Sequence, residues 1–131
     1  HQHDISRRQR QMCIRDSIKD DKKVFLKNKD RFLNQFSNSK HNVVKLGLIT
    51  IYFDFLNHFE EKEVSKIKTI VLNWTKNSSD WMILAQGMKL LEKLSKSDKS
   101  LKLKLIEVAK RLKNDERKVV RTKAQKILED N

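Results

Sequence analysis

The chain has 131 residues, and its 30 Lys and Arg outnumber its 17 Asp and Glu, for a formal net charge of +13. It contains no proline and only two glycines, so the turn signals that β-hairpins need are missing and an all-α fold is expected. The longest strongly apolar run, residues 43–56, is interrupted by polar and charged residues and is too short to span a bilayer. We therefore expect a soluble, cytoplasmic protein that makes no membrane contact.

The N-terminal segment stands apart from the rest of the chain. Residues 7–17 read Arg-Arg-Gln-Arg-Gln-Met-Cys-Ile-Arg-Asp-Ser, which resembles, codon by codon, the in-frame translation of a transposase adapter used to build DNA sequencing libraries. The alternative is a native basic arm that contacts phosphates. We expect residues 1–17 to be a non-native, disordered leader and the true start of the native chain to be missing. The only cysteine, Cys13, belongs to this leader, so the remainder predicts neither a disulfide nor a thiol nucleophile.

Apolar residues at helical spacing predict three helices in the first half of the chain. The first spans about residues 21–36, with Phe25, Phe32 and Phe36 on one face. The second, about residues 43–58, is apolar nearly all round, as expected for a helix covered on more than one side. Asn42 is placed to cap that second helix. A cluster of glutamates favours the start of the third helix, and its expected core residues are Val64, Ile67, Val71 and Trp74.

Three more helices are predicted in the second half. Residues 77–79 form a break, and Asp80 is expected to cap the helix that follows it. The expected core residues of that helix are Trp81, Leu84, Ala85, Met88, Leu91 and Leu94. A turn at residues 95–98 precedes the next helix, whose apolar stripe is Leu101, Leu105, Val108 and Leu112. A turn at 114–115 precedes the last, with Val120, Ala124, Ile127 and Leu128.

A pattern recurs along these helices at a spacing of 38 to 39 residues. Apolar helices open at 42–47, 80–85 and 119–124, and each has a small residue shortly after its first large apolar one, namely Gly47, Ala85 and Ala124. A fixed period in this range is typical of an α-solenoid, in which each unit buries its face against its neighbours. We expect six helices in antiparallel pairs. Because the last helix has no partner, we expect residues 18–131 to be one domain and a fragment of a longer chain.

The repeat resembles a known family most closely near its end. Residues 115–128 contain Asp115, Val120-Arg121, Ala124 and Leu128, an order that is similar to the Asp…Val-Arg…Ala…Leu pattern of HEAT and armadillo-like repeats. Residues 80–94 match more loosely because they lack the arginine, and residues 42–56 have Asn and Gly in place of Asp and Ala. The resemblance implies a non-catalytic scaffold that holds a peptide, a protein surface or nucleic acid in a curved groove.

Basic residues are concentrated in the second half. Residues 89–126 hold 14 Lys and Arg against five acidic residues. Lys99, Lys102, Lys110 and Lys113 fall within about 80° of each other on a helical wheel. We expect this surface to bind a protein partner with an acidic surface, with nucleic acid as the alternative. A solvated face in a lysine-rich sequence is the competing interpretation. The predicted partner-binding residues are Lys66, Lys68, Lys102, Lys110, Lys113, Arg117 and Arg121.

Several residues suggest a catalytic or ligand-binding role, but each also has a simpler structural explanation. Trp81 occupies a repeated apolar position, which favours the core over stacking on a nucleic-acid base. Asp80 beside Trp81 is similar to the acidic residue and tryptophans of HEAT-like DNA glycosylases, but Asp80 also stands where a helix cap is needed. His41 and His58 lack metal-ligand spacing. No nucleophile, paired-carboxylate or phosphate-loop pattern occurs. We expect no enzymatic activity, no cofactor, no metal and no small-molecule substrate.

Overall fold

The computed structural model describes residues 22–130, with side chains from Leu26 onward. The predicted leader lies outside the described residues, as does the side chain of Phe25. The described chain forms six α-helices and no strand, which confirms the all-α prediction. The helices are α2 (Lys22–Asp30), α3 (Asn42–Asp54), α4 (Glu61–Asn77), α5 (Trp81–Leu94), α6 (Lys99–Leu112) and α7 (Lys118–Glu129).

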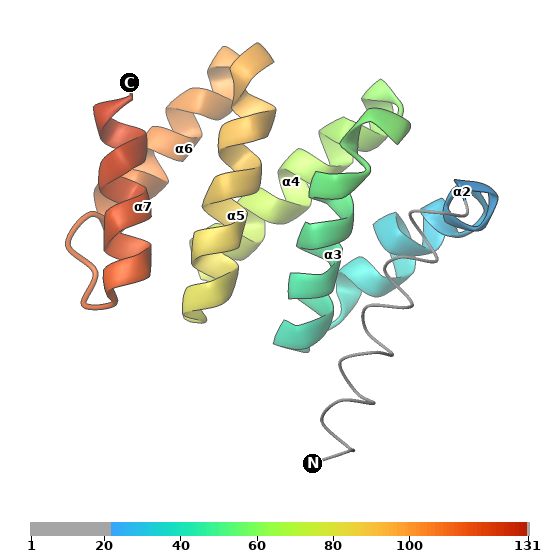
Figure 1. The fold of residues 1–131 in the computed structure, drawn as a ribbon, viewed down its shortest axis with the longest axis horizontal. Helices are drawn as coiled ribbons and strands as arrows, with labels where there is room; N and C mark the ends of the chain where they lie inside the picture. The colour runs from blue at the N-terminus through green and yellow to red at the C-terminus, as the bar shows by residue number, and fades with distance from the viewer. Residues whose placement is uncertain (1–21, 131) are drawn as a thin grey trace.

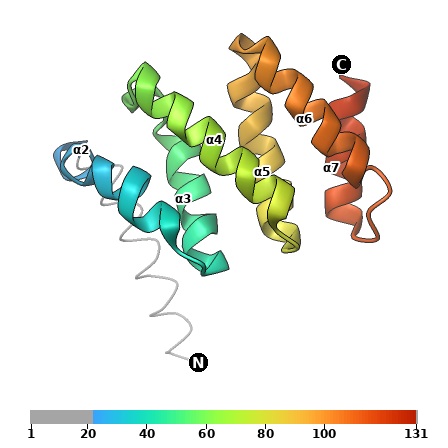
Figure 2. The same ribbon diagram turned by 180° about the vertical axis from the view of Figure 1, so that it is seen from behind.

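The helices lie in two layers. α3, α5 and α7 run side by side in the same direction and form one layer, and α2, α4 and α6 form the other behind it (Figure 1). The reverse view shows the second layer in front, with its three helices again side by side (Figure 2). α5 stands at the centre, because it contacts α3 and α7 within its layer and α4 and α6 across the layers. Chain-neighbouring helices thus alternate between the layers.

The core lies between the two layers and contains most of the predicted apolar stripes. α4 buries Ile67, Val71 and Trp74 as predicted, and α6 buries its whole predicted stripe. Eight of the 14 residues of α5 are buried. Fully buried side chains from both layers therefore meet in one cluster, which includes Tyr52, Ile67, Ile83, Met88, Leu91, Leu105 and Ile127.

Of the two helix caps predicted from the sequence, one forms and the other does not. Asp80 Oδ1 accepts hydrogen bonds from the backbone N–H groups of Met82 (2.9 Å) and Ile83 (3.1 Å), so Asp80 caps α5 as predicted. The predicted Asn42 cap is wrong. His41 is the residue before α3 and makes no side-chain capping bond, while Asn42 is the first residue of the helix. The Asn42 amide instead donates to Asp80 Oδ2 at 3.3 Å.

The first predicted helix, residues 21–36, is not a single regular helix. After α2 the chain continues as a π-helical turn, Arg31–Gln35, and a 3₁₀ turn, Phe36–Asn38. Side chains supply local bonds through these turns: Ser37 Oγ donates to the Leu33 carbonyl and Asn38 Nδ2 donates to the Asn34 carbonyl. The buried Tyr52 hydroxyl of α3 donates to the carbonyl of Phe32. A widened turn frees main-chain oxygens for such bonds, which a periodicity argument does not detect.

The small residues of the repeat do not share one role. Gly47 is exposed, and a Cβ added to it would meet nothing within 4 Å. Gly87, by contrast, is buried, and a Cβ there would lie 2.4 Å from Thr75 Cγ2 of α4. Counted from the first residue of each helix, Gly87 of α5 matches the fully buried Ala124 of α7. Of the three small residues that the sequence singled out, Ala85 and Ala124 are buried and Gly47 is exposed.

Within the described part of the chain, no helix combines the length and the apolar character that crossing a bilayer requires.

Candidate functional site

The lysines predicted to bind a partner do not gather at one place. Lys102, Lys110 and Lys113 are exposed on α6. Arg111 of the same helix donates to the carbonyls of Thr75 (2.7 Å) and Lys76 (2.9 Å) on α4. The three lysines lie roughly 100° to 180° around the helix from Arg111, so they occupy the side of α6 turned away from α4. Lys66 is also exposed, but it lines a groove between α4 and residues 33–38.

The other three predicted residues make contacts within the protein. Lys68 Nζ of α4 pairs with Asp98 Oδ2 at 2.9 Å, next to the start of α6. Arg117 donates to both carboxylate oxygens of Asp115, at 2.9 and 3.0 Å, and to the carbonyl of Ser79. Arg121 donates to the carbonyls of Asp115 and Glu116. These groups join neighbouring helices or hold the turn before α7.

Electrostatics strengthen the turn before α7. The side-chain and backbone hydrogen bonds of Arg117 lower the pKa of Asp115 to about 2. In return, the hydrogen bonds that Arg117 donates to the Asp115 carboxylate raise the pKa of Arg117, so both groups stay charged at neutral pH. The pair also extends to the preceding unit through the Ser79 carbonyl, 38 residues away from Arg117. Its first role is therefore to fix the start of α7 against the start of α5.

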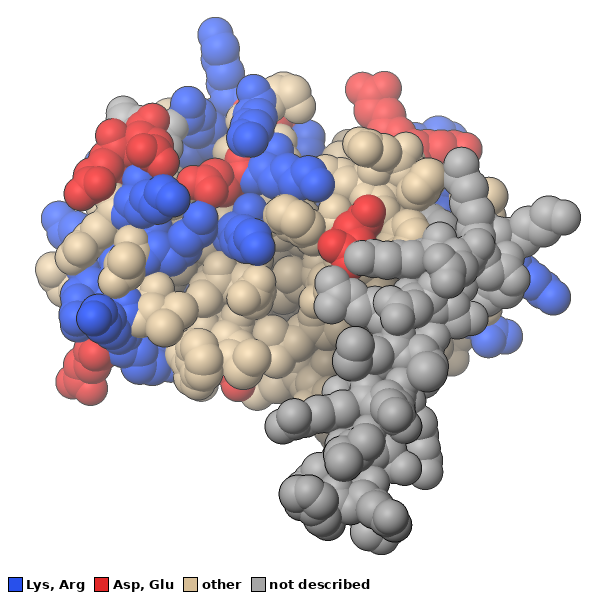
Figure 3. All heavy atoms as spheres, viewed as in Figure 1, with Lys and Arg blue, Asp and Glu red and all other residues tan. Residues whose placement is uncertain are grey.

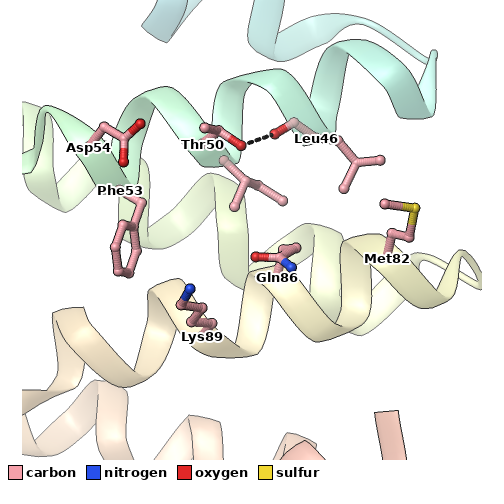
Figure 4. Close-up of a pocket in the computed structure, with 8 residues that line it drawn as sticks. Leu46, Thr50, Phe53, Asp54, Met82, Gln86 and Lys89 are labelled. Atoms are coloured by element: carbon pink, nitrogen blue, oxygen red, sulfur yellow. Dashed lines mark hydrogen bonds between the residues drawn. The ribbon is translucent and has the colours of Figure 1, made fainter. Parts of the chain in front are cut away.

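A groove of about 360 Å³ runs between α3 and α5 on the face of the α3–α5–α7 layer. The sequence did not predict it. One end is apolar and is lined by Leu46, Ile49 and Met82, while Thr50 and Gln86 lie along its middle. Thr50 Oγ1 donates to the Leu46 carbonyl at 3.1 Å, so its hydroxyl is already bonded within α3. Figure 4 shows Gln86 and Lys89 pointing from α5 towards α3 across this groove.

The other end of the groove is aromatic and basic. The Phe53 ring projects from α3 towards α5 (Figure 4). The ammonium nitrogens of Lys89 and Lys93 lie 5.0 and 4.2 Å from its centroid, within the range of cation–π attraction. Lys93 Nζ also donates to the Phe53 carbonyl at 3.2 Å. Both lysines are thus held at the groove by the end of the neighbouring helix.

Large apolar side chains are exposed at the starts of the three front helices. Val43, Met82 and Val119 are each the second residue of their helix, and 76%, 42% and 53% of their surface is exposed. Trp81 is 45% exposed, so the prediction that it belongs to the core is wrong. Trp81 is the first residue of α5, whereas the first buried residue is Ile83. The residues that the sequence comparison aligned at a spacing of 38, Val43, Trp81 and Val119, are all exposed, so this repeated position lies on the surface and not in the core.

Charge is unevenly spread over the same face. Figure 3 shows Lys and Arg gathered over the part formed by α5 to α7, and uncharged side chains covering the lower middle. Lys89 is exposed and Lys93 is half-buried on α5. No ion pair joins either lysine to a carboxylate among residues 26–130. By contrast, Glu92 of α5 is paired with Lys123 of α7 at 2.9 Å.

Asp80, the one residue considered for catalysis, has both carboxylate oxygens engaged, since one caps α5 and the other accepts from the Asn42 amide. No group of three His, Cys, Asp or Glu that could hold a metal occurs in the part of the chain that the structure describes. Met82, Lys89 and Lys93 were missed as site residues by sequence reasoning. Their spacing of seven and four residues was the available signal, since it places them on one face of a helix.

Comparison with protein-family models, with curated proteins and with solved structures found no match to this chain.

Proposed function

We propose that this chain is a HEAT-like helical repeat scaffold that binds a protein partner with an acidic surface and catalyses no reaction. The observation that carries the proposal is the groove between α3 and α5, where exposed apolar side chains adjoin two lysines without a carboxylate partner among the described residues. Protein interfaces combine apolar anchors with a charged rim in this way.

Contacts that recur between units support the repeat part of the proposal. The starts of α3 and α5 are joined by Asn42 and Asp80, and the starts of α5 and α7 by Ser79 and Arg117; each pair is separated by 38 residues. Further contacts between neighbouring helices of this layer are Lys93 with the Phe53 carbonyl and Lys123 with Glu92. In a helical repeat array each unit contacts its neighbours, and the array forms one extended binding face.

Nucleic-acid binding is the second candidate, and two observations favour it. The lysine stripe of α6 is exposed, and Trp81 offers an aromatic face on which a base can stack. Three arginines, however, donate to main-chain carbonyls of the protein itself: Arg111, Arg117 and Arg121. Arginine is the side chain best suited to bidentate base contacts. We therefore rank a protein partner above nucleic acid, and a HEAT-like DNA glycosylase activity below both, since Asp80 acts as a helix cap.

A binding comparison tests this ranking. The full chain is prepared with Arg7, Arg8, Arg10 and Arg15 replaced by serine, so that the adapter-like arginines contribute nothing. Fluorescence anisotropy then measures binding of a random glutamate–tyrosine copolymer and of a DNA duplex across a salt series. We expect the copolymer to remain bound at physiological salt, because apolar contacts are not screened. Tight duplex binding with a steep salt dependence, together with no copolymer binding, would instead establish the nucleic-acid function.

The predicted lysine stripe is tested in the same assay. If Lys102, Lys110 and Lys113 contribute to partner binding, replacing all three by glutamate weakens copolymer binding. Unchanged binding would remove the α6 stripe from the interface and leave the face of α3, α5 and α7.

A further inference from the structure

We infer that the groove between α3 and α5 recognises an acidic protein segment through two adjacent features: one large apolar side chain that enters beside Met82, and a carboxylate that follows it towards Lys89 and Lys93. This inference rests on the proposed function and names the partner chemistry of its groove. It differs from a general basic surface, because it requires an apolar anchor and an acid in a fixed order along α5.

The apolar end is shaped to take one side chain. Ile49 is 3% exposed and forms the floor, and the half-buried Leu46 and the exposed Met82 form the two walls. A methionine side chain has three rotatable bonds and a polarisable sulfur, so Met82 can adjust to different anchors. The groove volume of about 360 Å³ is at the small end of the range for ligand sites. It therefore fits one anchor side chain and not a folded surface.

The basic end is placed to meet a carboxylate. An ammonium group has three donor hydrogens, and Lys93 uses one of them on the Phe53 carbonyl. Lys89 contacts the Phe53 ring and makes no hydrogen bond to the described residues. Lys89 follows Met82 by seven residues, two turns along the same face of α5. An acidic residue about three positions beyond the anchor in an extended partner can span that distance of roughly 10 Å.

One acidic group also lines the groove. Asp54 is exposed at the end of α3 and lies beside Phe53 in the chain, at the basic end of the groove (Figure 4). Asp54 already takes part in an interaction within the protein. The role of binding the partner's carboxylate is therefore assigned to Lys89 and Lys93 alone.

The test uses the full chain with the four leader arginines replaced by serine, and two probes of equal length: poly-glutamate and the random glutamate–tyrosine copolymer. We expect the copolymer to bind more tightly than poly-glutamate, because only the copolymer carries an aromatic anchor. Met82→Ser should weaken copolymer binding by about tenfold and leave poly-glutamate binding unchanged. Lys89→Gln should weaken copolymer binding by about three- to tenfold.

Lys62→Gln is the matched control, because it removes the same charge from an exposed helical position on α4, in the other layer. We expect it to change copolymer binding by less than about twofold, since it lies outside the groove and long-range charge effects are screened. Circular dichroism establishes that each variant is folded.

The outcomes separate this inference from the proposed function. If the unmodified groove binds both polymers equally and Met82→Ser has no effect, the inference is overturned while acidic-partner binding stands. If neither polymer binds, both are overturned. If Lys89→Gln and Lys62→Gln weaken copolymer binding equally, the charge acts as a diffuse surface and the groove has no special role. If Lys89→Gln weakens binding of a DNA duplex but not of the copolymer, the groove serves nucleic acid and the inference fails.

Discussion

Asn42 and Asp80 lie 38 residues apart in the chain, and their side chains are joined by a hydrogen bond of 3.3 Å at the starts of α3 and α5. Asp80 uses one carboxylate oxygen to cap its own helix and the other to accept from Asn42. One side chain therefore caps α5 and joins it to the start of α3. The same face carries the groove proposed to bind a partner.

Removing the Asp80 carboxylate tests its capping role. We expect Asp80→Ala to lower the free energy of unfolding by about 1–2 kcal/mol, because two backbone N–H groups at the start of α5 lose their acceptor. Asn42→Ala is the matched control, and it should cost less than about 0.5 kcal/mol, since it removes only an exposed bond. Urea unfolding followed by circular dichroism measures both. Equal losses would show that the bond between the units, and not the cap, provides the stability.

The two glycines are expected to respond oppositely to the same substitution. Gly87→Ala should lower the free energy of unfolding by roughly 1–3 kcal/mol, because its new Cβ overlaps Thr75 Cγ2. Thr75 cannot rotate freely, since it is buried and its hydroxyl donates to the Leu72 carbonyl. Gly47→Ala should raise the free energy of unfolding by about 0.5–1 kcal/mol, because alanine favours the helix and no atom lies close to the added methyl group.

A double variant identifies the cause of the Gly87 effect. Thr75→Ser removes Cγ2 and keeps the hydroxyl, so combining it with Gly87→Ala should restore much of the lost stability. A Gly87→Ala loss that persists unchanged in the double variant would point to a contact other than Thr75.

Because Tyr52 is buried, the protein is expected to lose stability at high pH. Burial raises the pKa of the Tyr52 hydroxyl well above its usual value near 10. A raised pKa in the folded state stabilises the protein below the unfolded pKa, and that contribution is lost as the pH rises above about 10. Tyr52→Phe should remove this component of the alkaline transition and lower the free energy of unfolding by roughly 1 kcal/mol at neutral pH, because the Phe32 carbonyl loses its donor. Unfolding curves at neutral and alkaline pH check both effects.

Asp115 predicts a loss of stability at low pH. Its pKa is lowered to about 2 by the hydrogen bonds of Arg117, so the carboxylate is more readily ionised in the folded state than in the unfolded state. Its stabilising effect is complete above the unfolded value near 3.9 and disappears as the pH falls towards 2. Thermal unfolding between these pH values should therefore change less in Asp115→Asn than in the original chain. An identical pH dependence would show that other carboxylates govern acid unfolding.

Sequence reasoning succeeded where a residue acts on its own helix. Asp80 was predicted as a cap because the capping group and the N–H groups it binds are adjacent in the chain. Ile67, Val71 and Trp74 were predicted as core because apolar residues at helical spacing form one face, which has to pack against another part of the protein. Reasoning failed for Trp81, whose exposure depends on where α5 begins relative to α3 and α7. Val43, Trp81 and Val119 all lie in the first turn of their helices, before the first buried residue, and all three are exposed.

The groove could not be predicted, because its walls come from different helices. Phe53 ends one helix, Lys93 lies 40 residues later, and their contact depends on the spacing between α3 and α5. Likewise, Arg117 and Arg121 resembled free basic residues in the sequence, and only the folded turn shows that they bind carbonyls and Asp115.

By itself, the amino-acid sequence determined that the described chain is helical, where most of its helices lie and which stripes they bury, because periodicity and capping act within a few residues. The tertiary structure alone decided which helices lie side by side, which charged side chains form bonds within the protein and which apolar side chains remain exposed. Those outcomes depend on contacts between residues 30 to 40 positions apart, whose geometry follows from how the two layers pack.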